Sequence, residues 1–129
     1  MTTLLLDTHT ALWFWWDDPQ LSATAKALIC DPANRKLVSL ATPWEVAIKV
    51  SRKKLDIGGP FSGFFDQQMI RTFFEWLPIA TKHLNYVADL PFHHADPFDR
   101  LIIAQAISEG ISIVSADVQL DAYHITRFW

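Results

Sequence analysis

The stretch Leu4-Leu5-Leu6-Asp7-Thr8 sets the pattern from which the fold of this chain can be predicted. A short apolar run stopped by polar residues predicts a buried strand, which we place at residues 3–6. The bulky residues from Thr8 to Trp16 predict a helix directly after it, so Asp7 stands at a strand-to-helix junction. In a parallel sheet, such junctions lie at the carboxyl edge of the strands, where ligands bind.

Three further carboxylates stand at the end of an apolar run or at the start of a helix. They are Glu45, Asp99 and Asp117. Two unit charges about 4 Å apart repel each other by roughly 4 kcal/mol at an effective dielectric constant near 20. A cluster of carboxylates is tolerated when a divalent cation neutralises it or when one group stays protonated. The pattern therefore points to a hard-metal site and to chemistry on phosphate.

The rest of the chain alternates between strand and helix patterns. Helices are expected at residues 22–30, 42–54, 61–76, 81–90, 97–109 and 117–120, and strands at 37–40, 77–79, 111–114 and 125–128. Thr42 and Glu45 are predicted to form a capping box at the start of their helix. This alternation predicts a single α/β domain over residues 1–129 with a mainly parallel sheet.

Composition narrows the function classes. The formal net charge of −3 argues against a domain that holds nucleic acid by bulk charge alone. The single cysteine, Cys30, excludes a disulfide framework within the chain and a Cys-rich zinc site. We expect a cytoplasmic protein, because the sequence shows no signal-peptide pattern and no apolar run of the roughly 20 residues that span a membrane.

Each carboxylate also has a purely structural explanation. Asp7, Asp96 and Asp117 are all suited to cap helices, and Asp99 stands three residues after Asp96. Capping alone would use Ser, Thr or Asn at several of these places, so the joint pattern favours a metal site. With oxygen ligands only, Mg²⁺ or Mn²⁺ is the expected ion. We expect the three histidines near these acids to be solvated or hydrogen-bonded loop residues rather than zinc ligands; they are His9, His93 and His94.

The sequence resembles the PIN domain and, more narrowly, the VapC-type toxins of bacterial toxin–antitoxin pairs. The similarity covers essentially the whole chain, and its most specific piece is Asp96-Pro97-Phe98-Asp99-Arg100. The other matching stretches are Leu4-Leu5-Leu6-Asp7-Thr8-His9, Trp44-Glu45-Val46-Ala47-Ile48-Lys49 and Val114-Ser115-Ala116-Asp117. The resemblance implies a three-layer α/β/α fold and a ribonuclease dependent on Mg²⁺ or Mn²⁺. It also implies an RNA substrate, a homodimer, and inhibition by a small VapB-like antitoxin.

Carried over residue by residue, the resemblance assigns the catalytic and metal-binding roles to Asp7, Glu45, Asp99 and Asp117. Asp7 and Asp99 are expected to hold one ion, and the other two carboxylates to complete its coordination directly or through water. The implied reaction is metal-assisted hydrolysis of a phosphodiester. Supporting positions are Thr8, Asp96 and Ser115.

Four basic residues are candidates for roles near this site. Lys49, Arg52 and Lys53 share one helical face and either contact RNA phosphates or form a solvated surface. For Lys49, an ion pair with Glu45 one turn away is the alternative. Arg100, also a supporting candidate, is expected either to pair with the acidic cluster or to reach the substrate.

Aromatic residues are unusually frequent in two segments. Trp13–Trp16 are consecutive, so a helix cannot direct all of them into one core. Phe61–Trp76 carries a second aromatic face at helical spacing. We expect about half of these residues to pack on the sheet and the remainder to form a surface that an antitoxin covers.

Two other functions compete with the nuclease. A HAD-like phosphatase would use Asp7 as a nucleophile, but it would need a second Asp where this chain has His9. A non-catalytic binding module would use the acids only as helix caps. Stabilisation by Mn²⁺ separates this last alternative from a metal enzyme, because only a protein with a metal site gains stability by mass action.

Overall fold

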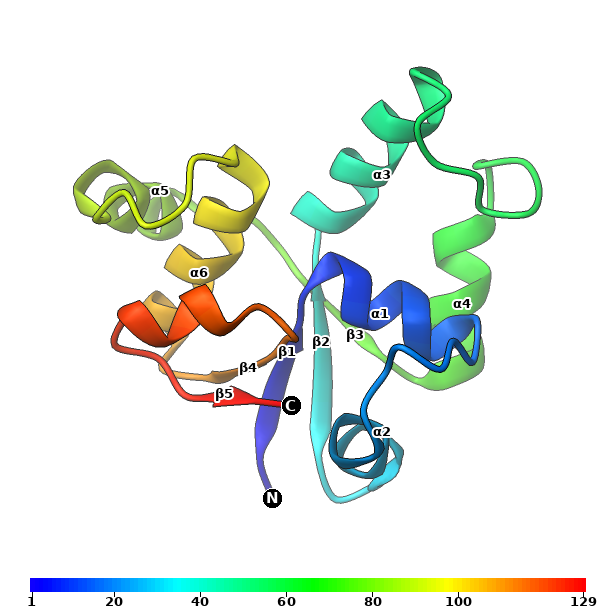
Figure 1. Cartoon of the computed structure of the whole chain (residues 1–129), viewed down its shortest axis with the longest axis horizontal. Helices are drawn as coiled ribbons and strands as arrows, with labels where there is room; N and C mark the ends of the chain where they lie inside the picture. Colours follow the sequence, from blue (N-terminus) through cyan, green and yellow to red (C-terminus); the bar gives the residue numbers. More distant parts are fainter.

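The computed structural model describes residues 1–129 and contains one five-stranded sheet with helices on both faces (Figure 1). The sheet order is β3-β2-β1-β4-β5, and every neighbouring pair is parallel. The expected three-layer α/β/α fold is therefore confirmed, with a sheet that is entirely parallel. The strands are β1 (Thr3–Leu6), β2 (Arg35–Ser39), β3 (Glu75–Leu77), β4 (Ser112–Val114) and β5 (Arg127–Phe128).

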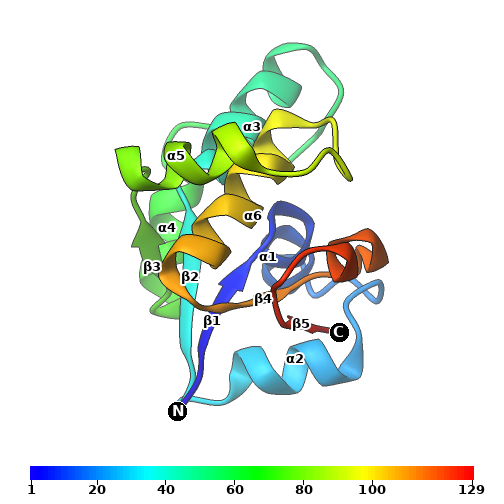
Figure 2. The same ribbon diagram turned by 90° about the vertical axis from the view of Figure 1, so that its left-hand side faces the viewer.

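Helices α1, α2 and α4 cover one face of the sheet, and α5, α6 and the 3₁₀ helix η1 cover the other (Figures 1 and 2). Helix α3 follows β2 and packs against both α1 and α6. None of these helices is both long and apolar enough to cross a bilayer. Their bounds are α1 (Thr8–Trp15), α2 (Ala23–Cys30), α3 (Ala41–Ser51), α4 (Phe64–Thr72), α5 (Thr81–Asp89), α6 (Pro97–Glu109) and η1 (Val118–Ala122).

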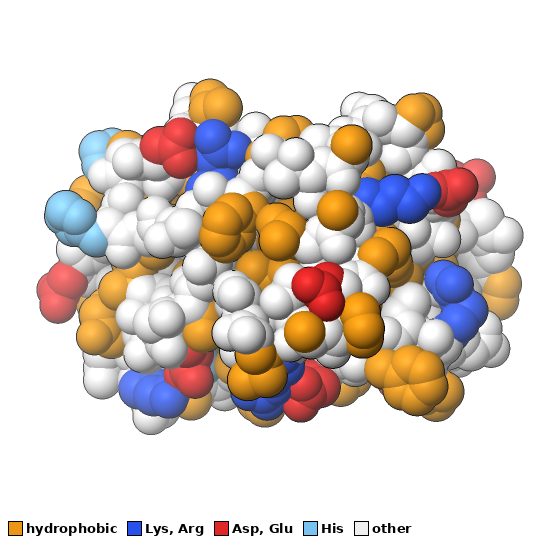
Figure 3. All heavy atoms as spheres, turned by 90° about the horizontal axis from the view of Figure 1, so that it is seen from below, with side chains coloured by type: hydrophobic (Ala, Val, Ile, Leu, Met, Phe, Trp, Pro, Cys, Tyr) orange, Lys and Arg blue, Asp and Glu red, His pale blue; other side chains and the backbone are white.

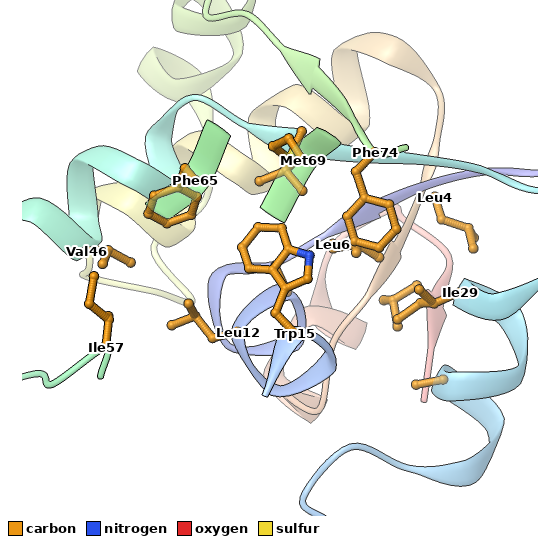
Figure 4. Close-up of a cluster of buried hydrophobic side chains, with 14 residues drawn as sticks. Leu4, Leu6, Leu12, Trp15, Ile29, Val46, Ile57, Phe65, Met69 and Phe74 are labelled. Atoms are coloured by element: carbon orange, nitrogen blue, oxygen red, sulfur yellow. The ribbon is translucent and has the colours of Figure 1, made fainter. Parts of the chain in front are cut away.

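Strand β1 is the centre of the hydrophobic core. Leu4 and Leu6 face α1, α2 and α4, where they join Trp15 and other apolar side chains (Figure 4). Leu5 points to the opposite face and packs with residues of α6, such as Ile103. Because alternate residues of a strand face opposite sides, one run of leucines supplies both cores. All three leucines are completely buried.

The start of α3 differs from the predicted capping box. The helix begins at Ala41, and its cap residue, Leu40, makes no side-chain cap hydrogen bond. Thr42 is buried inside the first turn, where its hydroxyl lies 3.1 Å from that of Thr8. The capping prediction is wrong because a contact with α1 uses the hydroxyl that the helix end would otherwise use.

The predicted helix at 61–76 is also too long. Helix α4 is bounded by Gly63 and Phe73, both of which have a left-handed backbone conformation with φ of 81° and 57°. Glu75–Leu77 then pairs with β2 as an edge strand, two residues before the strand expected at 77–79. Backbone pairing with β2 therefore overrides the helical spacing of the aromatic residues in this segment.

Gly110 offers a test of how α6 ends. It caps the helix with φ of +66°, and a Cβ added there would meet no neighbouring atom. We expect Gly110→Ala to lower the free energy of unfolding by about 1–2 kcal/mol, because only the left-handed backbone opposes a side chain. Urea denaturation measures this change. Gly59→Ala, also in open space but without a positive φ, is the control and should change stability little.

Candidate active site

Asp7 lies where the order of the strands reverses. Strand β1 pairs with β2 on one side and with β4 on the other, so chain connections leave this point in opposite directions. In open parallel sheets, ligands bind at such a point beyond the carboxyl ends of the strands. The Asp7 amide donates to the Val114 carbonyl of β4 at 3.3 Å, which anchors the residue beside that strand.

The Asp7 carboxylate is held by two hydrogen bonds. Its Oδ1 accepts from the Thr10 amide at 2.9 Å and so caps α1. Its Oδ2 accepts from the hydroxyl of Ser115, which follows β4. The Ser115 Oγ in turn accepts from the Asp117 amide at 3.1 Å, so one serine links two of the candidate acids.

Asp99 and Asp117 join Asp7 around a small cavity. Asp99 lies in the first turn of α6, which Asp96 caps by accepting from the Phe98 and Asp99 amides. Asp117 caps η1. The cavity measures about 20 Å³, which is enough for one water-sized occupant. Its walls are Asp7, Asp99, Ile102, Ile103, Ile113, Asp117 and Leu120.

Glu45, on α3, does not line this cavity, but it lies close enough to Asp99 to raise the pKa of that carboxyl, and it is only 4% exposed. Its Oε1 accepts from the Thr8 hydroxyl at 2.8 Å, and its Oε2 accepts from the Lys49 ammonium at 2.6 Å. A buried carboxylate is costly unless it is paired and hydrogen-bonded, and these two contacts meet that requirement. Lys49 is therefore the ion-pair partner of Glu45, which was one of the two alternatives that the sequence left open.

The carboxylates disturb one another electrostatically. Burial, together with the negative charges of Asp96, Glu45 and Asp7, raises the pKa of Asp99 from 3.8 to about 6. Only the interaction with His94 opposes this rise in the pKa, and it does so in part. Burial also raises the pKa of Asp7, even though the hydrogen bonds from Ser115 and Thr10 oppose the change. The site therefore has too little positive charge for the carboxylates that it gathers.

The arrangement suits a hard cation by its chemistry. Carboxylate oxygens are the ligands that Mg²⁺ and Mn²⁺ prefer, and three carboxylates line one cavity of water size. No group of three or more Asp, Glu, His or Cys side chains is yet drawn together at metal-ligand distances. Ser115 donates to Asp7, and Lys49 donates to Glu45.

His94 is a residue near the site whose role the sequence did not reveal. It is 8% exposed, and its Nε2 lies 2.6 Å from the Asp117 carboxylate. Because an ionised carboxylate only accepts hydrogen bonds, Nε2 carries the hydrogen. The Nδ1 of His94 lies 3.0 Å from the Tyr123 hydroxyl. The expectation of a hydrogen-bonded loop histidine is confirmed, but its partner lies 23 residues along the chain and cannot be read from local sequence.

Arg100 has neither of its two expected roles. Its buried guanidinium donates to the carbonyls of Val87, Leu90, Pro91 and His94 at 3.0–3.3 Å. It therefore binds the last turn of α5 and the loop that follows it, rather than the acids. The exposed Arg52 and Lys53 lie just beyond α3, which ends at Ser51 rather than at residue 54, and Lys53 has a left-handed backbone. The prediction that they share one helical face with Lys49 is therefore wrong.

Comparison with known proteins places this chain in a family. The family model described as the PIN domain matches residues 4–125. The chain belongs to the PIN-domain family. Among curated proteins, this PIN domain is 29% identical over 129 residues to Ribonuclease VapC22 of Mycobacterium tuberculosis (strain ATCC 25618 / H37Rv). That match covers 98% of this chain and 96% of the relative.

Solved structures share the fold of this PIN domain. One is VapBC2 from Rickettsia felis bound to a DNA fragment from its promoter, with a TM-score of 0.67 and 16% identity over 98% of each chain. Another is FitAcB from Neisseria gonorrhoeae, with a TM-score of 0.65 and 18% identity over 98% of this chain and 96% of the other. At these identities, the likeness shows the fold alone.

The raised pKa of Asp99 predicts how pH changes the stability of the protein in EDTA. The folded state binds this proton more tightly than the unfolded chain, so the free energy of unfolding falls as pH rises from 3.8 to about 6. We expect Asp99→Asn to stabilise the protein at about pH 7 by on the order of 1 kcal/mol, with a smaller gain at about pH 4.

Urea denaturation at both pH values measures this difference. Asp89→Asn, which removes an exposed carboxylate at the end of α5, controls for the loss of one negative charge. If Asp99→Asn instead destabilises the protein near neutral pH, the negative charge of Asp99 does not lower the stability of the folded state.

Proposed function

We propose that this PIN domain is a ribonuclease that hydrolyses RNA phosphodiesters with Mg²⁺ or Mn²⁺. The supporting observation is the cavity at the β1/β4 switch point, to which α6 contributes Asp99 and the segments after β1 and β4 contribute Asp7 and Asp117. A relative that aligns with nearly the whole chain is named a ribonuclease. The shortage of positive charge around Asp99 adds support, because a divalent cation would supply what the chain lacks.

In the proposed mechanism, Asp7 and Asp99 would hold the cation, and Glu45 and Asp117 would complete its coordination directly or through water. Such an ion lowers the pKa of a bound water and stabilises negative charge on the phosphate. Ser115 and Thr10 orient the Asp7 carboxylate, and Thr8 and Lys49 orient that of Glu45. These contacts fix the acids before substrate arrives, which lowers the cost of organising the transition state.

A small antitoxin and a second copy of the chain are the proposed protein partners. Solved structures that share this fold are named VapBC2 and FitAcB. The surface proposed for the antitoxin includes Ile70 and Phe73, which are 76% and 89% exposed. Phe73 also lines a groove of about 590 Å³ with Met1 and Ile29, on the side of the molecule where α2 and the amino terminus lie. That side shows hydrophobic side chains among charges of both signs (Figure 3).

The alternative functions have weaker support. Membership of the PIN-domain family favours the nuclease over a HAD-like phosphatase. A binding module in which the acids only cap helices accounts for Asp7, Asp96 and Asp117, each of which does cap a helix. It does not account for Glu45, which is buried and caps nothing.

The proposal predicts cleavage of RNA by purified, antitoxin-free protein with Mg²⁺ or Mn²⁺. EDTA should abolish cleavage, and Asp7→Asn should slow it by at least about 100-fold, because the ion contributes several kcal/mol to the transition state. Circular dichroism confirms that the variant folds. Asp66→Asn, an exposed acid on α4, is the matched control and should retain activity. Cleavage that survives Asp7→Asn would refute the site assignment.

His94 predicts a separate effect on metal binding. Because its Nε2 orients Asp117, we expect His94→Asn to raise the Mn²⁺ concentration for half-maximal activity by about 10- to 100-fold. The rate at saturating Mn²⁺ should fall much less. His93→Asn replaces the exposed neighbour and should leave the Mn²⁺ dependence unchanged. Equal Mn²⁺ curves for all three proteins would exclude a positioning role for His94.

A further inference from the structure

Two aromatic rings meet where α3 and α6 pack together near the carboxylates. The ring centroids of Trp44 and Phe98 are 4.8 Å apart, and the ring planes are nearly perpendicular, at 84°. Trp44 directly precedes Glu45 in the chain, and Phe98 directly precedes Asp99. The pair therefore bridges the first turns of the two helices that carry these acids.

Trp44 does little for the hydrophobic core. It is 56% exposed and belongs to neither core cluster. Phe98, in contrast, packs against the cluster around Leu5 and Ile103. The contact with Phe98 holds the indole ring at the surface beside the acidic site, where much of the ring remains open to solvent.

We propose that Trp44, supported by Phe98, is a stacking platform for an unpaired RNA base next to the phosphate that is cut. This inference rests on the proposed ribonuclease function. Bases stack on exposed aromatic rings in single-stranded nucleic acid sites, where cations alongside contact the backbone. Helix α3 carries Trp44 near its start, and two exposed cations, Arg52 and Lys53, come directly after its last residue, Ser51.

Charge gives a second reason to expect stacking at this site. The chain carries a net charge of −3, and Lys49 is already paired with Glu45. Electrostatic attraction to the phosphate backbone is the main source of affinity in basic nucleic-acid-binding proteins. A chain with a negative net charge attracts the backbone only weakly. A stacked base adds affinity without any net positive charge. The substrate is then RNA that is unpaired at the cleavage point, since a base inside a duplex cannot reach the ring.

Fluorescence anisotropy with a labelled single-stranded RNA of mixed sequence tests the platform. The Asp7→Asn background with Mn²⁺ prevents cleavage during the measurement. We expect Trp44→Leu in this background to weaken binding by about 5- to 140-fold, and Trp44→Phe to restore most of the loss. Tyr86→Leu is the matched control, because Tyr86 is a 45% exposed aromatic residue on α5, away from the acidic site. It should leave RNA binding unchanged.

Removal of single bases from the RNA identifies the stacking partner. When the base that stacks on Trp44 is removed, the Trp44→Leu substitution should weaken RNA binding only a little. With an abasic site at any other position, the substitution should weaken binding as much as it does with intact RNA. Annealing the RNA to its complement should abolish the advantage as well. The same penalty at every abasic position, or no penalty with intact RNA, would overturn the proposal.

Two further measurements separate this proposal from its alternatives. Sedimentation of Trp44→Leu reports whether the ring instead contacts a second copy of the chain, and a change of oligomeric state without a loss of RNA binding would overturn the platform. Cleavage by the protein with Asp7 intact reports on the proposed function. Mn²⁺-dependent cleavage that is equally fast with and without the Trp44→Leu substitution would refute the platform alone. Absence of both cleavage and RNA binding would refute both proposals.

Discussion

The burial of β1 on both faces is the constraint on which the rest of the structure depends. Leu4, Leu5 and Leu6 are completely buried, and the strand hydrogen-bonds to β2 and β4 at once. A strand so enclosed has one register that keeps its side chains out of water. Asp7 therefore emerges at a fixed point between two neighbouring strands, and the polar groups after those strands gather around it.

The cost in stability of this gathering is visible in the pKa of Asp99, which burial and like charges raise to about 6. The chain offsets part of the repulsion locally. Lys49 pairs with Glu45, and Ser115 donates to Asp7. Such partners hold each acid in place but do not remove the excess of negative charge. Carboxylates that lower the stability of the folded protein and have a perturbed pKa are typical of functional sites.

Particular residues show which parts of the structure were predictable from sequence. The caps at Asp7, Asp96 and Asp117 lie where expected, because capping depends on residues a few positions apart. Helix α4 was overextended because pairing with β2 took Glu75–Leu77 into the sheet, although the aromatic spacing continued. Thr42 failed as a cap because its hydroxyl meets Thr8 across the helix interface.

The sequence by itself determined the alternation of strands and helices and the placement of acids at their junctions, since both follow from local pattern. Tertiary structure decided which polar groups meet. It directed Arg100 to four backbone carbonyls at the end of α5 and in the loop after it, His94 to Asp117, and Trp44 to Phe98. These partners depend on how the helices pack on the sheet. Packing brings together side chains that are distant in the chain, and the local sequence around each residue does not indicate which distant residue it will contact.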